Sequence, residues 1–355
     1  MYSREIKDCP TKFVRHARPV FGTFKGHPER LDIRGIFKPY GVVPLPVFIT
    51  NLRIKSRISY YFNIGEYIGS IKFFDVKIMG LVEVCFWNKT TNQRYRYRSV
   101  MGPRKRFVPH KLNLAATSCY KKKRYIRISW DRKRDKLSVI FDLRGDGIKP
   151  NANAALTSKF SSSPNTELTT VVPAPTHRRS SASYQTSLPL HGAISLFSPD
   201  GEQKTMQDAE GLMFLDVNRT YMKFRSYGKT VTALGEVDGK QIALRLFVTS
   251  QDAVDSDKYN SNVLFYDSEV TPLPPVVITN PYGKMNKWII QDTENMVDLT
   301  FSPVSNNVNK ASIFVLRLDY ETFYGTFEGM VCTARGKKIN LKALQGLTEK
   351  YVIRL

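Results

Sequence analysis

The chain has 355 residues, of which 42% are hydrophobic and 12% aromatic, and its formal net charge is +23. This composition excludes a disordered chain, and the length is sufficient for two domains of ordinary size. Residues 1–150 carry 33 basic and 11 acidic side chains, whereas residues 151–355 carry 21 and 20. The asymmetry indicates either an anionic partner for the first half or a solvated basic face without a specific partner.

The cysteines and the N-terminus set further limits. The four cysteines, Cys9, Cys85, Cys119 and Cys332, form no C-x-x-C pair, and no histidine lies at zinc-ligand spacing from them. We therefore expect free thiols, no metal and no cofactor. The N-terminal residues lack the apolar core of a signal peptide, and no apolar run is long enough for a transmembrane helix. These features predict a cytoplasmic protein.

The first half carries the signals of short strands separated by turns. The run Arg94-Tyr95-Arg96-Tyr97-Arg98 alternates with period two, which in a strand places the arginines on one face and the tyrosines on the other. The segments Arg124–Trp130 and Leu137–Leu143 flank a polar turn and predict a hairpin. We expect Tyr95, Tyr97 and Tyr125 to lie in a core and the arginines to lie on a solvated face.

Residues 151–189 are rich in Ser, Thr, Ala, Asn and Pro, which indicates a linker or long loop. Strand signals resume at residue 190, and neither half shows apolar stripes of helical period. The sequence therefore predicts an all-β protein with few helices. We expect a basic β domain over residues 1–150 and a second β domain over residues 190–355, packed as two antiparallel barrels or barrel-like sandwiches.

Several stretches resemble a known family. The C-terminal ones are TPLPPVVITNPYG (Thr271–Gly283), WIIQDTENMVDLTFSP (Trp288–Pro303) and YGTFEGMVCTARGKKINLKALQGLTEKYVIRL (Tyr324–Leu355). They are similar to the Domain of Unknown Function 2804 family, and VFGTFKG, the strand 61–74 and VPAPTHRR in the earlier part are compatible with it. The resemblance implies a mainly bacterial family without an assigned activity. It also implies a remote similarity to the AttH and carotenoid-hydratase-like proteins, which carry two lipocalin-like barrels, and such a fold alone does not carry function.

The stretch Arg94–Arg134 holds fifteen basic side chains against one acid, Asp131. We expect an anion-binding face for membrane headgroups, nucleic acid or an acidic protein. Its candidate residues are Arg94, Arg96, Arg98, Arg104, Lys105, Arg106, Lys121, Lys122, Lys123, Arg124, Arg132, Lys133 and Arg134. The chain has no helix-turn-helix, zinc-finger or RNP-like motif, so any nucleic-acid binding would be independent of sequence.

Asp292 and Glu294, together with Asp298, form the tightest acidic group of the chain. Inside a barrel, such carboxylates could act as general acid and base in a hydratase or isomerase. The alternative is a polar turn after a strand, since Asp-Thr-Glu-Asn suits a loop. The motifs of common hydrolases, nucleotide-binding proteins and zinc proteases are not found in the sequence.

Three functions remain open from the sequence. The first is non-enzymatic binding of a lipid-like, apolar or amphipathic small molecule in a barrel lined by Trp288, Tyr221 and Tyr227, with the basic face holding an anionic surface. The second is a hydratase- or isomerase-like enzyme that acts on a hydrophobic substrate. The third is a basic protein that associates with nucleic acid regardless of sequence.

Overall fold

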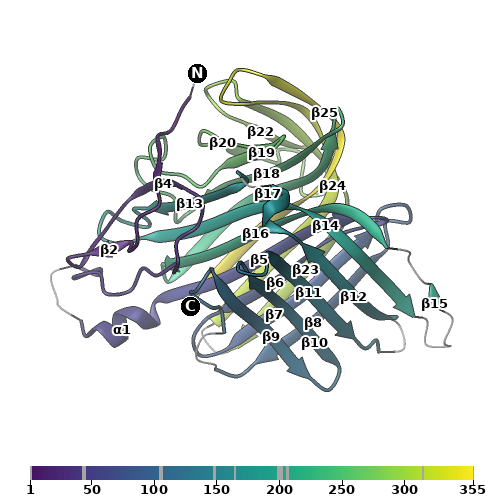
Figure 1. The fold of residues 1–355 in the computed structure, drawn as a ribbon, viewed down its shortest axis with the longest axis horizontal. Helices are drawn as coiled ribbons and strands as arrows, with labels where there is room; N and C mark the ends of the chain where they lie inside the picture. Colours follow the sequence, from purple (N-terminus) through teal and green to yellow (C-terminus); the bar gives the residue numbers. More distant parts are fainter. Residues whose placement is uncertain are drawn as a thin grey trace.

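The computed structural model describes residues 2–41, 45–103, 107–146, 149–163, 165–197, 203–204, 208–313 and 316–354. Two large sheets make up the molecule, and a two-stranded sheet joins β2 (Val14–Arg15) to β3 (Arg18–Pro19) (Figure 1). The described helices are one short α-helix, α1 (Val47–Leu52), and one turn of 3₁₀ helix, η1 (Phe160–Ser162). The prediction of an all-β fold with two packed barrel-like sheets is confirmed.

The first sheet is an almost closed barrel, and its main path runs β8-β7-β6-β5-β16-β14-β12-β11-β10-β9. The two ends of this path, β8 and β9, are consecutive along the chain, while β1, β4, β13 and β15 pair beside the path. The strands are β1 (Ile6–Asp8), β4 (Gly22–Lys25), β5 (Ile54–Ile64), β6 (Tyr67–Asp75), β7 (Gly80–Asn88), β8 (Arg94–Met101), β9 (Leu114–Lys121), β10 (Arg124–Asp131), β11 (Lys136–Leu143), β12 (Asn151–Ser158), β13 (Glu167–Val172), β14 (Ser181–Phe197), β15 (Gln203–Lys204) and β16 (Ala209–Tyr221).

The second sheet is a half-barrel with the order β20-β19-β18-β17-β25-β24-β23-β22-β21. Its strands are β17 (Arg225–Val237), β18 (Lys240–Thr249), β19 (Val263–Tyr266), β20 (Glu269–Pro272), β21 (Val277–Thr279), β22 (Trp288–Gln291), β23 (Val297–Ile313), β24 (Leu316–Cys332) and β25 (Lys338–Arg354). Every pairing along this path is antiparallel.

The segment 151–189 is not the linker that its composition suggests. It forms β12, β13 and the first half of β14, all within the first sheet. Along β12 the side chains alternate strictly between exposed and buried, so its small Ala, Ser and Thr residues follow the period of a half-buried strand. The chain passes to the second sheet between Tyr221, which ends β16, and Arg225, which begins β17.

The predicted alternation of tyrosines and arginines between the two faces of β8 is confirmed. Tyr95 and Tyr97 are only 8% and 1% exposed and lie in the core of the first barrel. The prediction for Tyr125 is wrong: its ring lies edge-on to Tyr120, which is 74% exposed, on the outer side of the barrel. The neighbouring residues Ile126 and Ile128 take the inward positions of β10, and the period of two then directs Tyr125 outward.

The two sheets pack face to face through strands that are buried on both sides. In β5, Tyr60 and Phe62 point into the first barrel, while Tyr61 points out and packs on Phe214 and on the second sheet. A separate apolar cluster therefore lies between the sheets. It contains Tyr61, Ile68, Cys85, Trp87, Leu168, Leu212, Phe214, Leu234, Ala243, Val263, Phe265, Tyr324 and Leu347.

The hairpin of β23 and β24 is long, since each strand has 17 residues. Its polar part packs against the first sheet. The side-chain amides of Asn307 and Asn309 donate to Glu83 on β7, and Trp87 Nε1 donates to Ser305. Polar residues that suggest a loop thus continue a strand, because partners on the other sheet satisfy them.

A buried ion pair also joins the sheets. Lys72 on β6 lies 2.8 Å from the Glu349 carboxylate on β25, and Tyr61 donates to the same carboxylate at 3.0 Å. Burial alone would raise the pKa of Glu349, but the charges of Lys72 and Arg245 lower it to about 2. The carboxylate is therefore ionised at neutral pH.

We expect the substitution Glu349→Gln to lower the free energy of unfolding by about 3–5 kcal/mol, because it leaves the Lys72 ammonium buried without a counter-charge. Urea denaturation at pH 7 measures this value. The matched control is Glu328→Gln, at an exposed position on β24, which should change the stability by no more than about 0.5 kcal/mol. Equal effects of the two substitutions would contradict the role of the ion pair.

The same pair predicts a pH dependence. The folded-state pKa of Glu349 is below its ordinary value of 4.5, so its contribution to stability is complete above pH 4.5 and is lost as the pH falls toward 2. The free energy of unfolding should therefore fall more steeply over this interval in the wild type than in the Glu349→Gln variant. Parallel curves for the two proteins would show that Glu349 is not the titrating group.

Candidate functional site

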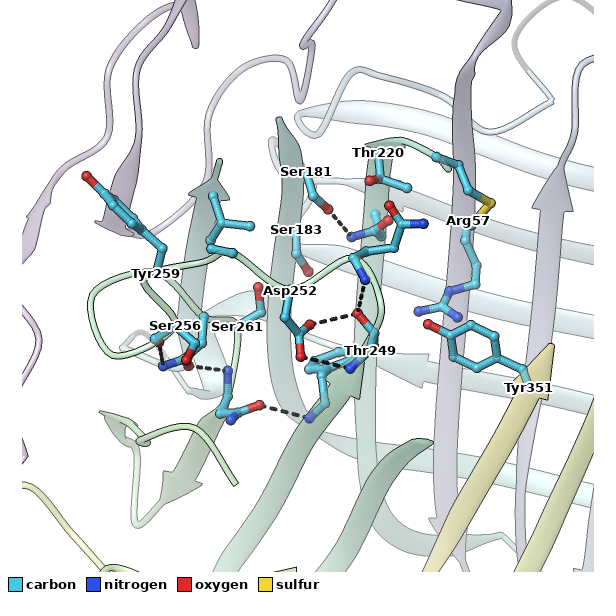
Figure 2. A pocket seen from close by; sticks show the side chains of 18 of the residues that line it. Arg57, Ser181, Ser183, Thr220, Thr249, Asp252, Ser256, Tyr259, Ser261 and Tyr351 are labelled. Atoms are coloured by element: carbon cyan, nitrogen blue, oxygen red, sulfur yellow. Dashed lines mark hydrogen bonds between the residues drawn. The ribbon is translucent and has the colours of Figure 1, made fainter. Parts of the chain in front are cut away.

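A cavity of about 380 Å³ lies between the two sheets, next to the loop that follows β18. Its walls come from β5, β14 and β16 of the first sheet and from β18, β24 and β25 of the second. Figure 2 shows Arg57 and Tyr351 on one side of the cavity, Ser181 and Ser183 behind, and Asp252, Ser256 and Tyr259 on the side of the loop. The site therefore depends on both sheets being in place.

The cavity lining is partly apolar and partly polar. The apolar side chains are Phe74, Val172, Met222, Phe247, Ala253, Pro275, Val276, Val277 and Ile353. The hydroxyl and amide groups come from Ser56, Ser181, Ser183, Asn218, Thr220, Thr249, Gln251, Ser256, Tyr259, Asn260, Ser261, Asn262, Tyr320 and Tyr351. Such a lining suits a molecule that has both an apolar and a polar part.

Arg57 belongs to a group of buried charges beneath the cavity. Its guanidinium lies 3.8 Å from the Asp216 carboxylate on β16, which also receives a hydrogen bond of 2.7 Å from Ser183 Oγ. Arg245 on β18 approaches the same carboxylate at 3.9 Å. The Arg245 side chain is fully buried between the rings of Tyr61 and Phe247, at 4.8 and 4.5 Å.

Tyr351 lies beside Arg57 and stacks on Tyr320, with the two ring centroids 5.6 Å apart (Figure 2). Burial raises the pKa of the Tyr351 hydroxyl, which therefore remains a hydrogen-bond donor at neutral pH. Gly228 on β17 makes room for this ring, because a Cβ there would lie 2.8 Å from the hydroxyl oxygen. The hydroxyl is thus held next to the guanidinium by close packing.

Asp252 is the one carboxylate among the described residues that line the cavity. Its oxygens accept hydrogen bonds from the Thr249 amide at 2.8 Å and the Thr249 hydroxyl at 2.7 Å (Figure 2). Protein atoms around the carboxyl group raise its pKa, although the side chain still meets solvent. Its geometry is that of a turn at the end of β18.

The structure does not bring together the aromatic residues expected to line a cavity. Trp288 is fully buried in the core of the second sheet, where its Nε1 donates to the Lys284 carbonyl. Tyr221 is fully buried in the first barrel and donates to the Ile33 carbonyl, while Tyr227 is 57% exposed. The alternation of a strand explains the difference, since β16 and β22 turn these rings into two separate cores.

Asp292 and Glu294 lie on the turn between β22 and β23, so the prediction of an acid–base pair inside a barrel is wrong. The Asp292 carboxylate accepts hydrogen bonds from the amides of Met296 and Val297, at 3.1 and 3.0 Å. Glu294 is exposed to solvent. The polar-turn alternative describes this segment correctly.

Three arginines of the expected anion-binding face instead join the two sheets. Arg94 donates to the Asn306 carbonyl, and Arg96 donates to Asn307 Oδ1 at 2.8 Å and to the Val308 carbonyl at 2.6 Å. Arg98 lies 3.7 Å from the Glu83 carboxylate. Their strand faces away from the barrel core, as the period of two predicts, but it faces β23 rather than open solvent.

The remaining candidates are not gathered on one surface. Lys121–Lys123 lie at the turn before β10, whereas Lys133 and Arg134 lie at the turn after it, roughly 25 Å away along the strand. Arg124 lies over the Tyr97 ring, and Arg132 pairs with Glu167 at 2.8 Å. Arg104, Lys105 and Arg106 lie outside the described residues.

Sequence reasoning missed the charged residues between the sheets: Arg57, Lys72, Asp216, Arg245 and Glu349. A signal exists for three of them. Lys72, Asp216 and Arg245 each lie between two apolar residues of a strand, as Arg245 does between Leu244 and Leu246. A charge in such a strand predicts a buried partner, but the partner can be far away in sequence, as Lys72 is from Glu349.

The part of the chain that the structure describes contains neither a cluster of metal ligands nor a membrane-spanning helix. No three His, Cys, Asp or Glu side chains there come together as metal ligands. None of the described helices is both long and apolar enough to cross a membrane.

Comparison with known proteins gives a family but no activity. No curated protein matches the sequence. Among solved structures, kievitone hydratase from Nectria haematococca has 13% identity and a TM-score of 0.42, with 83% of this chain and 88% of that chain covered. The β-propeller domain of the Trilobed protease from Pyrococcus furiosus has 9% identity and a TM-score of 0.14, with 81% and 94% covered. Residues 39–355 match the model of a family described as a domain of unknown function, and the chain belongs to this DUF2804 family.

Proposed function

We propose that this protein binds an amphipathic small molecule in the cavity between its two sheets. The observation that carries the proposal is the cavity itself, whose volume of about 380 Å³ lies in the range of small-molecule sites. Phe74, Met222 and Phe247 offer an apolar surface, while Arg57 and Tyr351 offer hydrogen-bond donors. The proposal keeps the ligand class expected from the sequence and moves the site from a barrel interior to the junction of the sheets.

An enzymatic role has less support from this site. Asp252 is positioned to meet a ligand, and its raised pKa is a property of general acids. Both of its oxygens, however, already accept hydrogen bonds from Thr249, and these bonds hold the end of β18. Binding without turnover is therefore the function that the geometry favours.

The test is to fill the cavity. Ser181 points into it from the beginning of β14, and we expect Ser181→Phe to weaken the binding of a neutral apolar dye, N-phenyl-naphthylamine, by at least about tenfold. Fluorescence titration of the purified protein gives the affinities. Ser195→Phe is the matched control, because Ser195 lies on the same strand with similar partial burial but outside the cavity lining.

Two results would overturn the proposal. One is the absence of saturable dye binding to the wild-type protein. The other is equal dye affinity of the wild type and the Ser181→Phe variant, since the dye would then occupy another place. Native mass spectrometry of gently purified protein supplies an independent readout, and we expect an additional mass in the wild type that Ser181→Phe lacks.

A further inference from the structure

We propose that the ligand of this cavity carries a single carboxylate, which binds beside Arg57. This inference rests on the proposed function and names the chemical class of the molecule. It starts from the uneven distribution of the buried charges between the sheets.

Six charged side chains form this layer, and their charges are unevenly distributed. The cations are Arg57, Lys72 and Arg245, whose side chains are 15%, 12% and 0% exposed. The anions are Asp216, Glu349 and Glu83, at 0%, 1% and 11%, and Glu83 lies opposite Lys72 in the register of β6 and β7. Lys72 thus has two anions nearby, whereas Arg57 and Arg245 share the carboxylate of Asp216 in a region largely withdrawn from water, where an uncompensated charge is costly.

The geometry identifies Arg57 as the one of these three cations that a ligand in the cavity can reach. Lys72 has a close counter-ion in Glu349, at 2.8 Å. Arg245 is enclosed by two aromatic rings and donates to the hydroxyls of Thr230 and Thr232. Arg57 shares Asp216 with Arg245 at the longer distance of 3.8 Å, and it is the one of the three that lines the cavity.

Unused hydrogen-bonding groups also line the cavity. Within the described part of the chain, Arg57 Nε, Thr220 Oγ1 and Gln251 Nε2 are buried without a hydrogen-bond partner, and all three residues belong to the lining. The Tyr351 hydroxyl lies next to Arg57 as a further donor (Figure 2). Buried polar groups are normally satisfied, so this cluster indicates an acceptor supplied from the cavity.

A carboxylate fits these groups better than a phosphate does. The guanidinium presents a planar set of N–H donors that matches a carboxylate and supplies one positive charge. Two cations line the cavity, Arg57 and Lys55, but the Lys55 ammonium already donates to the carbonyls of Leu52 and Val76, at 3.0 and 2.8 Å. Asp252 on the loop side would repel the second negative charge of a phosphate ester. The apolar part of the ligand would then lie against Phe74, Met222 and Phe247.

The test compares decanoate with decanol, which have the same apolar chain and differ in the charged group. We expect isothermal titration calorimetry at pH 7 to give at least tenfold tighter binding of decanoate to the wild-type protein. The Arg57→Gln variant should bind both with affinities within twofold of each other, while Arg57→Lys should retain a preference for decanoate. The Gln variant leaves Lys72 paired with Glu349 and Arg245 with Asp216, so neither of these two cations loses its carboxylate.

The outcomes separate the two proposals. Equal affinities of the wild-type protein for decanoate and decanol would overturn the carboxylate inference and leave the proposed function standing. No binding of either compound would overturn both. If Arg57→Gln does not fold, Arg57→Met keeps a long side chain, buries no new polar group and leaves Asp216 with Arg245, and it should show the same loss of preference. A preference that persists in a folded variant without Arg57 would also overturn the inference.

Discussion

The layer of charges between the two sheets is the constraint on which the rest of the structure depends. Apolar packing alone would allow the sheets to slide, because dispersion and hydrophobic contacts have little directionality. The pairs Lys72–Glu349 and Arg245–Asp216 have fixed partners, and they join β6 to β25 and β18 to β16 across the two sheets. A shift of the two sheets would leave Lys72 and Glu349 buried and unpaired, so the ion pair between them selects one arrangement.

The cavity follows from this arrangement. β5, β14 and β16 contribute one wall and β18, β24 and β25 the other, and the charged layer lies between the apolar cluster around Tyr61 and Phe214 and the cavity. The same residues therefore serve folding and the proposed binding. Because Arg57 is the member of the layer that reaches the cavity, its positive charge is available to a ligand rather than to solvent.

The alternation of inward and outward side chains along a single strand could be predicted from the sequence. The contacts between strands that are distant along the chain could not. Tyr95 and Tyr97 lie in the core as the period of two requires, whereas Tyr125 does not, because Ile126 and Ile128 set the opposite phase for its strand. Composition misled at residues 151–189, whose small polar side chains form strands. Asn307 and Asn309 also suggest a loop, and only their partner Glu83 on the other sheet explains their place in a long strand.

The candidate site lay beyond sequence reasoning for the same reason. Its central residues, Arg57, Asp216 and Arg245, come from three strands well separated along the chain, and none of them belongs to a local motif. The basic stretch 94–134 was the more conspicuous signal, but strand geometry distributes its cations over an interface between sheets and two opposite turns. The conspicuous basic stretch thus contains residues that pack the sheets together, whereas the charged residues of the candidate site do not stand out in the sequence.

Hydrogen–deuterium exchange in the presence and absence of decanoate tests the central claim most directly, namely that the ligand site is shared by the two sheets. The account predicts slower exchange on both sides of the cavity, at residues 218–222 of the first sheet and in the loop 249–262 after β18. Slower exchange confined to strands β8–β11, remote from the cavity lining, would contradict the account and place the ligand elsewhere.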